Sequence, residues 1–424
     1  MKIAVVGSGI SGLISALLLQ QKHDVKVFEA ESWIGGHVHT VPVQEQDKTL
    51  YIDTGFIVCN NKNYPNFMKL LEYLNISLQA ISMSFSVKNE DAKLEYNGTS
   101  INGMFAQRKN ICSPKFWRML FDINKFNNVA KSFAKSGDID TTLEQFLEPL
   151  NLSASCINDY ILPMTSAIWS NDSVTAGQIP ARFICEFYEN HGMLNINQRP
   201  QWYSIPGGSA TYITKLVNKL ITKPQANTKV HGVKCVANGV EVNFQDSAEV
   251  FDKIILATHS DQALRLLCNP TELEQNILSS IRYQKNSVIL HTDVSILPEN
   301  RRAWASWNYL VNQRGQEQGC TVTYNMNILQ NLAANKVYCV TLNQEQSLNH
   351  ELIISKFNYS HPAYDRAAIQ AQHRHREISG VNNIYYCGAY WGAGFHEDGI
   401  NSGLQVVRQI DKELFCAAQY IPEQ

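Results

Sequence analysis

Two adjacent side chains, His396 and Glu397, have the chemistry needed for proton transfer. An imidazole exchanges protons near neutral pH, and a neighbouring carboxylate can orient it or act as a base if burial raises its pKa. Both residues lie in a loop rich in glycine and aromatic residues, which a predicted helix follows. The alternative is structural, with His396 as a satisfied loop side chain and Asp398 as the N-cap of that helix.

The start of the chain has the pattern of a nucleotide-binding unit. An apolar run at 1–6 predicts a buried strand, 13–21 predicts a helix, and 25–29 predicts a second strand. Gly7 would permit the tight turn between the first strand and the helix, and Gly9 would let the backbone approach a pyrophosphate.

The other parts of this unit also suit a dinucleotide. Gly12 would let the helix pack close to the strand, and the helix N-terminus offers N–H groups and positive potential to phosphates. Glu29 ends the second strand, twenty residues after Gly9, and can accept hydrogen bonds from a ribose. The alternative is an ordinary tight turn, but strand, helix and terminal acid together favour dinucleotide binding.

A glycine doublet, Gly35 and Gly36, follows Glu29 closely and favours FAD over NAD. With this doublet, the unit resembles the FAD-binding amine oxidase superfamily, which includes protoporphyrinogen oxidase and phytoene desaturase. That superfamily usually has Arg after the doublet, whereas this chain has His37. The resemblance therefore implies that the pyrophosphate loses a fixed positive charge here, because His supplies only a donor or a partial charge.

The loop before the predicted C-terminal helix resembles the last FAD motif of the superfamily. An acid usually follows the first glycine of that motif, but here Ala389 follows Gly388, so this chain lacks the carboxylate for that contact. The helix N-terminus would stabilise a nearby anion by about 0.3–1 kcal/mol. Reduced flavin is such an anion, so this geometry would favour reduction.

The cofactor contacts expected from the motifs and the resemblance together come from five parts of the chain. They are Gly7, Gly9, Ile10, Ser11, Gly12, Glu29, Ala30, Gly35, Gly36, His37, Thr54, Gly55, Val233, Ala257, Thr258, Gly388, Gly399, Ile400 and Asn401. By the same resemblance, Val233 would touch the adenine.

The likeness extends over essentially the whole chain to a bacterial subgroup of predicted NAD/FAD-binding, amine oxidase-like proteins. The segments that resemble it are 53–56, 257–262, 290–293, 306–309 and 394–399. This subgroup is associated with cyclopropane fatty acid synthases, so the resemblance implies lipid modification without fixing a reaction. Many amine oxidases place a Lys beside flavin N5; the expected register puts Leu290 there and leaves Lys285 outside, which makes ordinary amine oxidation less favoured.

Two further segments each allow two interpretations. Between 102 and 197 helical patterns dominate, and basic residues alternate with aromatic ones between 108 and 135. This segment is either a solvated basic face or a surface that lies on an anionic membrane. The aromatic run at 303–309 is either core packing or one wall of a substrate pocket.

The composition limits the classes of protein and partner that this sequence allows. The chain of 424 residues is 44% hydrophobic and 17% charged, which is enough to bury a large core. Its net charge of −2 gives no case for nucleic acid as a partner. The ten cysteines form no CxxC pair, which argues against a zinc site or a dithiol redox pair. Without a signal peptide pattern or an apolar run of eighteen residues, we expect a cytoplasmic protein, or one peripheral at the inner membrane face if the basic segment binds lipid.

These observations predict an α/β protein, with a Rossmann-like FAD-binding domain interleaved with a substrate domain. The FAD domain would combine 1–87, 202–258 and 381–424. The substrate domain would combine a helical subdomain at 88–201 with a mixed sheet at 259–380.

We expect an FAD-dependent oxidoreductase that transfers a hydride at flavin N5 to or from an apolar, fatty-acyl or lipid-like substrate. Net transfer would also require an electron acceptor as a second partner. One alternative is a flavin-dependent isomerase without net redox. Another is an FAD-stabilised, non-catalytic partner of a lipid-modifying methyltransferase.

Overall fold

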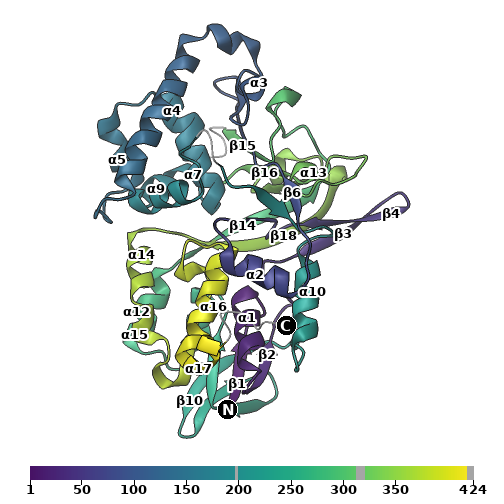
Figure 1. Cartoon of the computed structure of the whole chain (residues 1–424), viewed down its shortest axis with the longest axis vertical. Helices are drawn as coiled ribbons and strands as arrows, with labels where there is room; N and C mark the ends of the chain where they lie inside the picture. The colour runs from purple at the N-terminus through teal and green to yellow at the C-terminus, as the bar shows by residue number, and fades with distance from the viewer. Residues whose placement is uncertain (196–198, 312–319, 418–424) are drawn as a thin grey trace.

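A four-stranded parallel sheet joins three distant parts of the chain in the computed structural model, which describes residues 1–195, 199–311 and 320–417 (Figure 1). In spatial order its strands are β19 (Ile384–Tyr386), β13 (Lys253–Leu256), β1 (Lys2–Val6) and β2 (Asp24–Phe28). Most of the strand residues are apolar because packed elements cover both faces of the sheet, and the charged ones are Lys2, Asp24, Lys26 and Lys253.

Two helices, α1 (Ile10–Leu19) and α16 (His396–Ile410), cover one face of this sheet. They cross at glycines of α16: a Cβ atom at Gly403 would lie 2.5 Å from Cγ2 of Ile14 and 2.6 Å from the carbonyl oxygen of Ser11. A larger residue would push the helices apart, so the glycine fixes their separation. The other face packs against a small sheet and four helices: β10 (Gly232–Val236), β11 (Gly239–Asn243), β12 (Ala248–Phe251), α11 (Ser260–Leu266), α12 (Glu272–Ser280), α14 (Arg366–His373) and α15 (His375–Ile378).

A second, seven-stranded sheet forms the middle of the molecule (Figure 1). Its spatial order is β18 (Ile353–Pro362), β14 (Tyr283–His291), β17 (Cys339–Leu342), β16 (Val322–Asn325), β15 (Trp307–Val311), β7 (Phe85–Asn89) and β8 (Leu94–Asn97). Neighbours are antiparallel except β15 and β7, which are parallel.

A helical layer lies at the end of the molecule opposite β10 (Figure 1). Its helices are α3 (Ile101–Met104), α4 (Pro114–Phe133), α5 (Leu143–Leu147), α6 (Ala154–Cys156), α7 (Leu162–Trp169), α8 (Ser173–Gln178) and α9 (Ala181–Asn190). Shorter elements connect the layers: β3 (Thr40–Glu45), β4 (Lys48–Asp53), β5 (Val58–Asn60), α2 (Pro65–Tyr73), β6 (Gln79–Ile81), β9 (Trp202–Ser204), α10 (Ala210–Lys219), α13 (Met326–Leu329) and α17 (Lys412–Ala417). None of the helices in the described ranges is long and apolar enough to cross a membrane.

The α/β architecture and the interleaved mixed sheet agree with the prediction. The segments are distributed somewhat differently from the expected ranges. β7, expected to end the first FAD segment, pairs with β15 and so belongs to the seven-stranded sheet. Helices α11, α12 and α14, expected in the substrate domain, bury apolar residues against the four-stranded sheet instead. Ser209 precedes α10 but makes no capping bond, because its hydroxyl lies 2.9 Å from both the Asp53 carboxylate and the Phe56 carbonyl oxygen and donates its one hydrogen there.

Candidate active site

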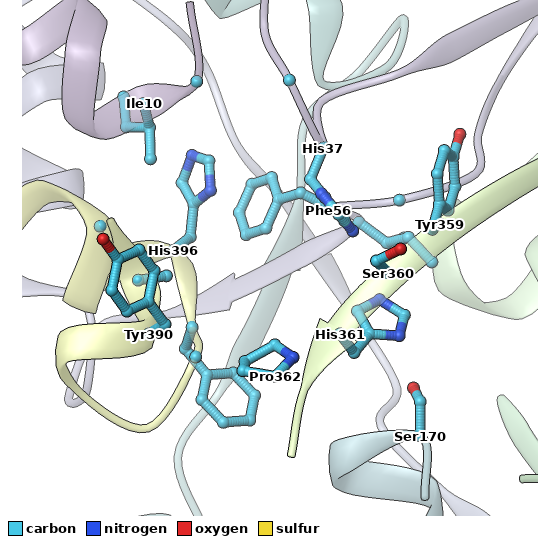
Figure 2. A pocket seen from close by; sticks show the side chains of 18 of the residues that line it. Ile10, His37, Phe56, Ser170, Tyr359, Ser360, His361, Pro362, Tyr390 and His396 are labelled. Carbon is cyan, nitrogen blue, oxygen red and sulfur yellow. The ribbon is translucent and has the colours of Figure 1, made fainter. Parts of the chain in front are cut away.

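One continuous cavity of about 1360 Å³ runs from the glycine turn after β1 to the helical layer. Single ligand sites usually measure roughly 300–1,000 Å³, so this volume has room for a large cofactor and a second molecule. Figure 2 shows part of its wall, with His396 and Tyr390 on one side of the view and Tyr359 and His361 on the other. The cavity thus lies between the four-stranded and the seven-stranded sheets.

The three glycines of the turn have the different roles expected of them. Gly7 has a φ of 104°, and a Cβ atom there would lie 2.6 Å from the carbonyl oxygen of Ala257. A Cβ atom at Gly12 would lie 2.2 Å from the carbonyl oxygen of Gly7, so Gly12 serves packing and does not line the cavity. A Cβ atom at Gly9 would meet no atom within 4 Å. Gly9 therefore borders open cavity, as a pyrophosphate site beside the N-terminus of α1 requires.

Glu29 lies in the cavity wall at the end of β2 and is held in place by Ser8. Its Oε2 accepts from the backbone N–H of Ser8 at 2.9 Å and from the Ser8 hydroxyl at 2.7 Å. The same hydroxyl accepts from the N–H of Gly35 at 3.1 Å. These bonds join the glycine turn, the acid and the doublet into one rigid unit, and Ala30 lines the cavity beside them.

Val233, the expected adenine contact, does not line the cavity. Val233 is a buried residue of β10, packed in the core away from the cavity. Val230, which precedes the strand, lines the cavity together with Thr228, and the N–H of Thr228 donates to the carbonyl oxygen of Glu29 at 2.7 Å. The prediction for Val233 does not fit its buried position, and Val230 is the valine of this stretch that borders the cavity. Both positions carry valine in an apolar, β-prone stretch, so only knowledge of where β10 begins could have separated them.

His37 lies where the superfamily usually has Arg, close to three other aromatic side chains of the cavity. Its ring centroid lies 5.1 Å from that of Tyr359, 5.3 Å from that of His361 and 6.2 Å from that of His259. Burial lowers the pKa of His37 to about 4, so its imidazole is neutral near pH 7. Its Nε2 is shielded from solvent and has no hydrogen-bond partner among the described residues, which leaves it available to a ligand in the cavity.

Thr54 and Gly55 join the doublet to the seven-stranded sheet. The Thr54 hydroxyl lies 2.7 Å from the Tyr359 hydroxyl, and a Cβ atom at Gly55 would lie 2.0 Å from the carbonyl oxygen of His37. Just before them, buried Asp53 accepts hydrogen bonds from Thr40, Ser209 and Gln330. This carboxylate ties four separate segments together behind the cavity wall.

His396 lines the cavity at the start of α16, as expected, but its environment changes its predicted chemistry. Its Nε2 lies 2.6 Å from the Tyr212 hydroxyl, and its ring stacks on Phe56 with centroids 3.8 Å apart. Burial lowers the pKa of His396 to about 3, so the imidazole is neutral near pH 7 and carries no proton to donate as a cation. It is an oriented, neutral group in the wall, and a general-acid role near neutral pH does not fit it.

Glu397 does not lie in the cavity wall, which corrects its expected catalytic position. It is a buried residue whose carboxylate turns away and accepts hydrogen bonds at 2.9 Å from the backbone N–H groups of Asn66 and Phe67, in the first turn of α2. It therefore caps a second helix. The cofactor predictions for Ile400 and Asn401 are corrected in the same way, because Ile400 packs in the core and Asn401 accepts from the side chain of Asn66.

The remaining predicted cofactor residues do line the cavity. They are Ile10, Ser11, Gly36, Ala257, Thr258, Gly388 and Gly399. Leu290, expected beside the flavin, is buried in the core of the seven-stranded sheet and does not line it, whereas Val288 of the same strand does. Lys285 is exposed and lies outside, as expected. Trp307 lines the cavity while Tyr309 packs in the core, so the aromatic run serves both expected purposes.

The end of the cavity near the helical layer is mainly apolar and aromatic. It is lined by Tyr96, Tyr160, Met164, Ile168, Trp169, Phe187, His191, Met193 and Trp202. The ring of His191 stacks on Phe187 with centroids 3.8 Å apart, and burial lowers the His191 pKa to about 4. We call this end the substrate arm. The sequence had shown helices in this region but not which of their faces would meet the cavity.

A model of the flavin-containing amine oxidoreductase family matches residues 10–303 of the chain. This chain belongs to the flavin-containing amine oxidoreductase family. It is thus a flavoprotein oxidoreductase with FAD as its cofactor. Gly9, Glu29, Val230 and His37 fit FAD because they offer open space at a phosphate-binding turn, a fixed acid, an apolar contact and an unpaired nitrogen along one cavity.

Similar proteins extend the comparison beyond the family match. Tryptophan 2-monooxygenase of Allorhizobium ampelinum is 28% identical over 170 residues, which is 40% of this chain and 21% of that protein. The match thus spans about a fifth of the length of this curated relative. Cyclohexylamine oxidase from Brevibacterium oxydans is 13% identical, with a TM-score of 0.69, over 97% of this chain and 99% of that one. A CLA-producing fatty acid isomerase from P. acnes is also 13% identical, with a TM-score of 0.66, over 96% and 97%. Likeness at this identity shows the shared fold alone.

Proposed function

We propose that this oxidoreductase transfers a hydride to or from an apolar, lipid-like substrate. The observation that carries the proposal is the composition of the substrate arm. Among the described residues, Glu29 and Glu31 are the carboxylates that line the cavity, and both lie at its nucleotide end. A protonated amine in the substrate arm would therefore find no counter-charge there, whereas an apolar chain would bury its surface against aromatic and thioether side chains.

A carboxylate head group on that chain would find a partner at the rim. Arg199 is exposed, lines the substrate arm, and lies close enough to Tyr160 to oppose the rise in the pKa of that phenol. Guanidinium pairs well with carboxylate because its donors match both oxygens. A fatty acyl substrate with a free carboxylate thus suits both the apolar wall and the charge at its edge.

FAD, when bound, would supply hydride transfer at flavin N5. The chain would contribute binding, orientation and exclusion of water. Phe187, Trp169 and Tyr364 give the cavity an aromatic wall that shields the reacting atoms from water. The N-terminus of α16 meets the cavity at His396 and Gly399, so its partial positive charge would stabilise negative charge that develops there.

The test is anaerobic reduction of the purified holoprotein. Long-chain unsaturated and saturated fatty acids would be compared with putrescine and cyclohexylamine, and flavin absorbance would be followed by stopped flow. Bleaching by a fatty acid but by neither amine supports the proposal, and bleaching by the amines alone contradicts it.

An isomerase is the second candidate, and the fold shared with a fatty acid isomerase is compatible with it. Mass spectrometry of the fatty acids separates the two reactions. Net hydride transfer changes the product mass by two hydrogens and needs an acceptor. An isomerase gives a product of unchanged mass without one.

A further inference from the structure

We propose that the outer face of the helical layer docks on an anionic lipid bilayer. This face, called here the docking face, combines the exposed apolar residues Ile101, Ile111, Trp117 and Phe121 with the basic residues Arg108, Lys109 and Lys115. It lies on α3, α4 and the segment between them, at the end of the molecule farthest from β10 (Figure 1). The proposal goes beyond the reaction, because binding to lipid does not require turnover.

The apolar residues of the docking face are side chains that the fold leaves uncovered. Ile101 is 80% exposed and Phe121 is 68% exposed. Helix α4 packs its opposite face, with Phe116, Met119 and Phe126, into the core of the helical layer. Phe121 lies one turn after Trp117, and their ring centroids are 6.4 Å apart. An aromatic pair of this kind suits the membrane interface, where Trp is enriched.

The apolar residues of the docking face lie on neighbouring segments of the chain. The indole N–H of Trp117 donates to the carbonyl oxygen of Ile111 at 2.8 Å, which fixes the ring over the segment before α4. The Trp117 ring also lies 5.5 Å from that of Phe105, at the end of α3, and the Phe105 N–H donates to the carbonyl oxygen of Ile101. These contacts place Ile111, Trp117 and Phe121 close together, and Ile101 lies in α3, whose C-terminal Phe105 contacts the Trp117 ring.

The charge of this region complements an anionic lipid surface. Between residues 100 and 136 the chain has seven basic residues and one acid. That acid, Asp122, is buried and already paired with Arg118 at 3.0 Å, so it does not offset the exposed Lys109 and Lys115. Two more exposed cations, Arg301 and Arg302, lie beside α3, because the side chain of Asn300 donates to the carbonyl oxygen of Ala106. The exposed acid Glu299, next to them in the chain, offsets only part of the excess of positive charge in this region.

The docking face adjoins the substrate arm. Tyr96, Gly98 and Thr99 line the cavity, and Ile101 follows Thr99 by two residues. Gly98 and Thr99 are exposed, so the cavity meets solvent at the edge of the docking face. A bilayer bound there would lie against the opening through which an apolar substrate enters.

Vesicle sedimentation tests the proposal with the full chain. Vesicles of phosphatidylglycerol and phosphatidylcholine would be compared with vesicles of phosphatidylcholine alone, at low salt and at about 1 M salt, where the Debye length is about 3 Å. Test variants are the pairs Lys109→Glu with Lys115→Glu, and Ile101→Ser with Phe121→Ser. Matched controls at the far end are Lys234→Glu on β10 and Ile221→Ser, where Ile221 is 79% exposed.

The wild-type protein should bind the anionic vesicles at low salt and dissociate from them at high salt. The charge variant should bind at least tenfold more weakly, since each cation near an anionic surface contributes about a factor of five. The apolar variant should also bind more weakly, and both controls should bind as wild type does. Absence of binding at low salt, equal binding to neutral vesicles, or unchanged binding by both test variants would overturn the proposal. The proposal would also be overturned if the protein self-associated but did not bind vesicles, and if Ile101→Ser with Phe121→Ser abolished the self-association. The docking face would then join two copies of the chain.

Discussion

Glu397 and Phe67 are joined by a hydrogen bond of 2.9 Å from the Phe67 backbone N–H to the Glu397 carboxylate. The second residue of α16 thereby caps α2, a helix of a different part of the chain. Replacing Glu397 by Ala should lower the free energy of unfolding by about 1–3 kcal/mol, because the buried N–H of Phe67 and the partly buried N–H of Asn66 lose their acceptor. Urea unfolding followed by circular dichroism would measure it. In variant molecules that retain FAD, the rate of flavin reduction should equal that of wild type. A rate lower by a hundredfold with unchanged stability would instead restore Glu397 as a catalytic group.

Gly9→Val should leave the fold intact and weaken FAD binding. A side chain there meets no protein atom within 4 Å but would fill the space beside the N-terminus of α1. Flavin content after purification and thermal unfolding of the apoprotein would be measured together. Gly137→Val is the control, since it also meets open space but lies in a surface loop. A Gly9→Val protein with full flavin content would contradict the assignment of the glycine turn to the pyrophosphate.

His37→Ala should raise the Kd for FAD by about tenfold, the effect of losing one neutral hydrogen bond. Because the pKa of His37 is lowered to about 4, the imidazole is uncharged near pH 7. The contribution of His37 to binding should therefore be independent of salt and of pH between 6 and 9. Titration of apoprotein with FAD at two ionic strengths checks this, with the exposed His350→Ala as control. A strongly salt-dependent difference between wild type and His37→Ala would show that His37 binds FAD as a cation.

His396→Ala should keep FAD and slow flavin reduction by about 10–10²-fold, because the wall that orients the substrate loses a ring stacked on Phe56. The pH profile of reduction above pH 5 should not change, since burial lowers the pKa of His396 to about 3. Tyr212→Phe, which removes the bond to Nε2, should have a smaller effect of the same kind. Stopped-flow reduction across pH would distinguish the roles. Loss of an inflection near neutral pH in His396→Ala would identify a titrating base.

Asp53 should make the stability of the protein depend on pH. Burial raises its pKa from 3.8 to about 7, so the folded state binds more protons than the unfolded state between about pH 4 and pH 7. The free energy of unfolding should fall as pH rises through this window and level off above it. Urea unfolding of wild type and Asp53→Asn at several pH values would isolate the effect. The stability advantage of wild type over the variant should shrink with rising pH, and a constant difference would show that Asp53 does not titrate there.

The glycine turn and Glu29 could be predicted because local chemistry determines them. A tight turn and a close approach of the backbone to a pyrophosphate both require glycine, and the ribose contact requires an acid at a strand end. All three features fall within one segment of about thirty residues. The geometry of Gly7, Gly9 and Gly12 follows that expectation position by position. The alternation of strands and helices could also be predicted, because the period of the apolar residues reflects which faces of an element are buried.

Glu397 could not be assigned from its neighbours in sequence. Its partner Phe67 lies 330 residues away, and nothing local signals that the carboxylate points there. The pKa of His396 also depends on residues that are distant in the sequence. A histidine side chain alone predicts a pKa near neutrality, but enclosure by Phe56, Phe67 and Tyr212 lowers it. Helices α11 and α12 pack on the four-stranded sheet and not on the expected mixed sheet, because an apolar helix face alone does not indicate which sheet it covers.

The glycine crossing of α1 and α16 sets an order for biosynthesis. The ribosome must reach Gly403 before Ile14 can pack against α16, and β19 joins the sheet only shortly before that. Gly388, Tyr390 and His396, which close one side of the cavity, come from the same late segment. The nascent chain therefore exposes the apolar face of α1 until residues near Gly403 have been synthesised, and its cofactor site is incomplete until then. Until α16 covers that face, the incomplete chain exposes apolar surface that favours aggregation.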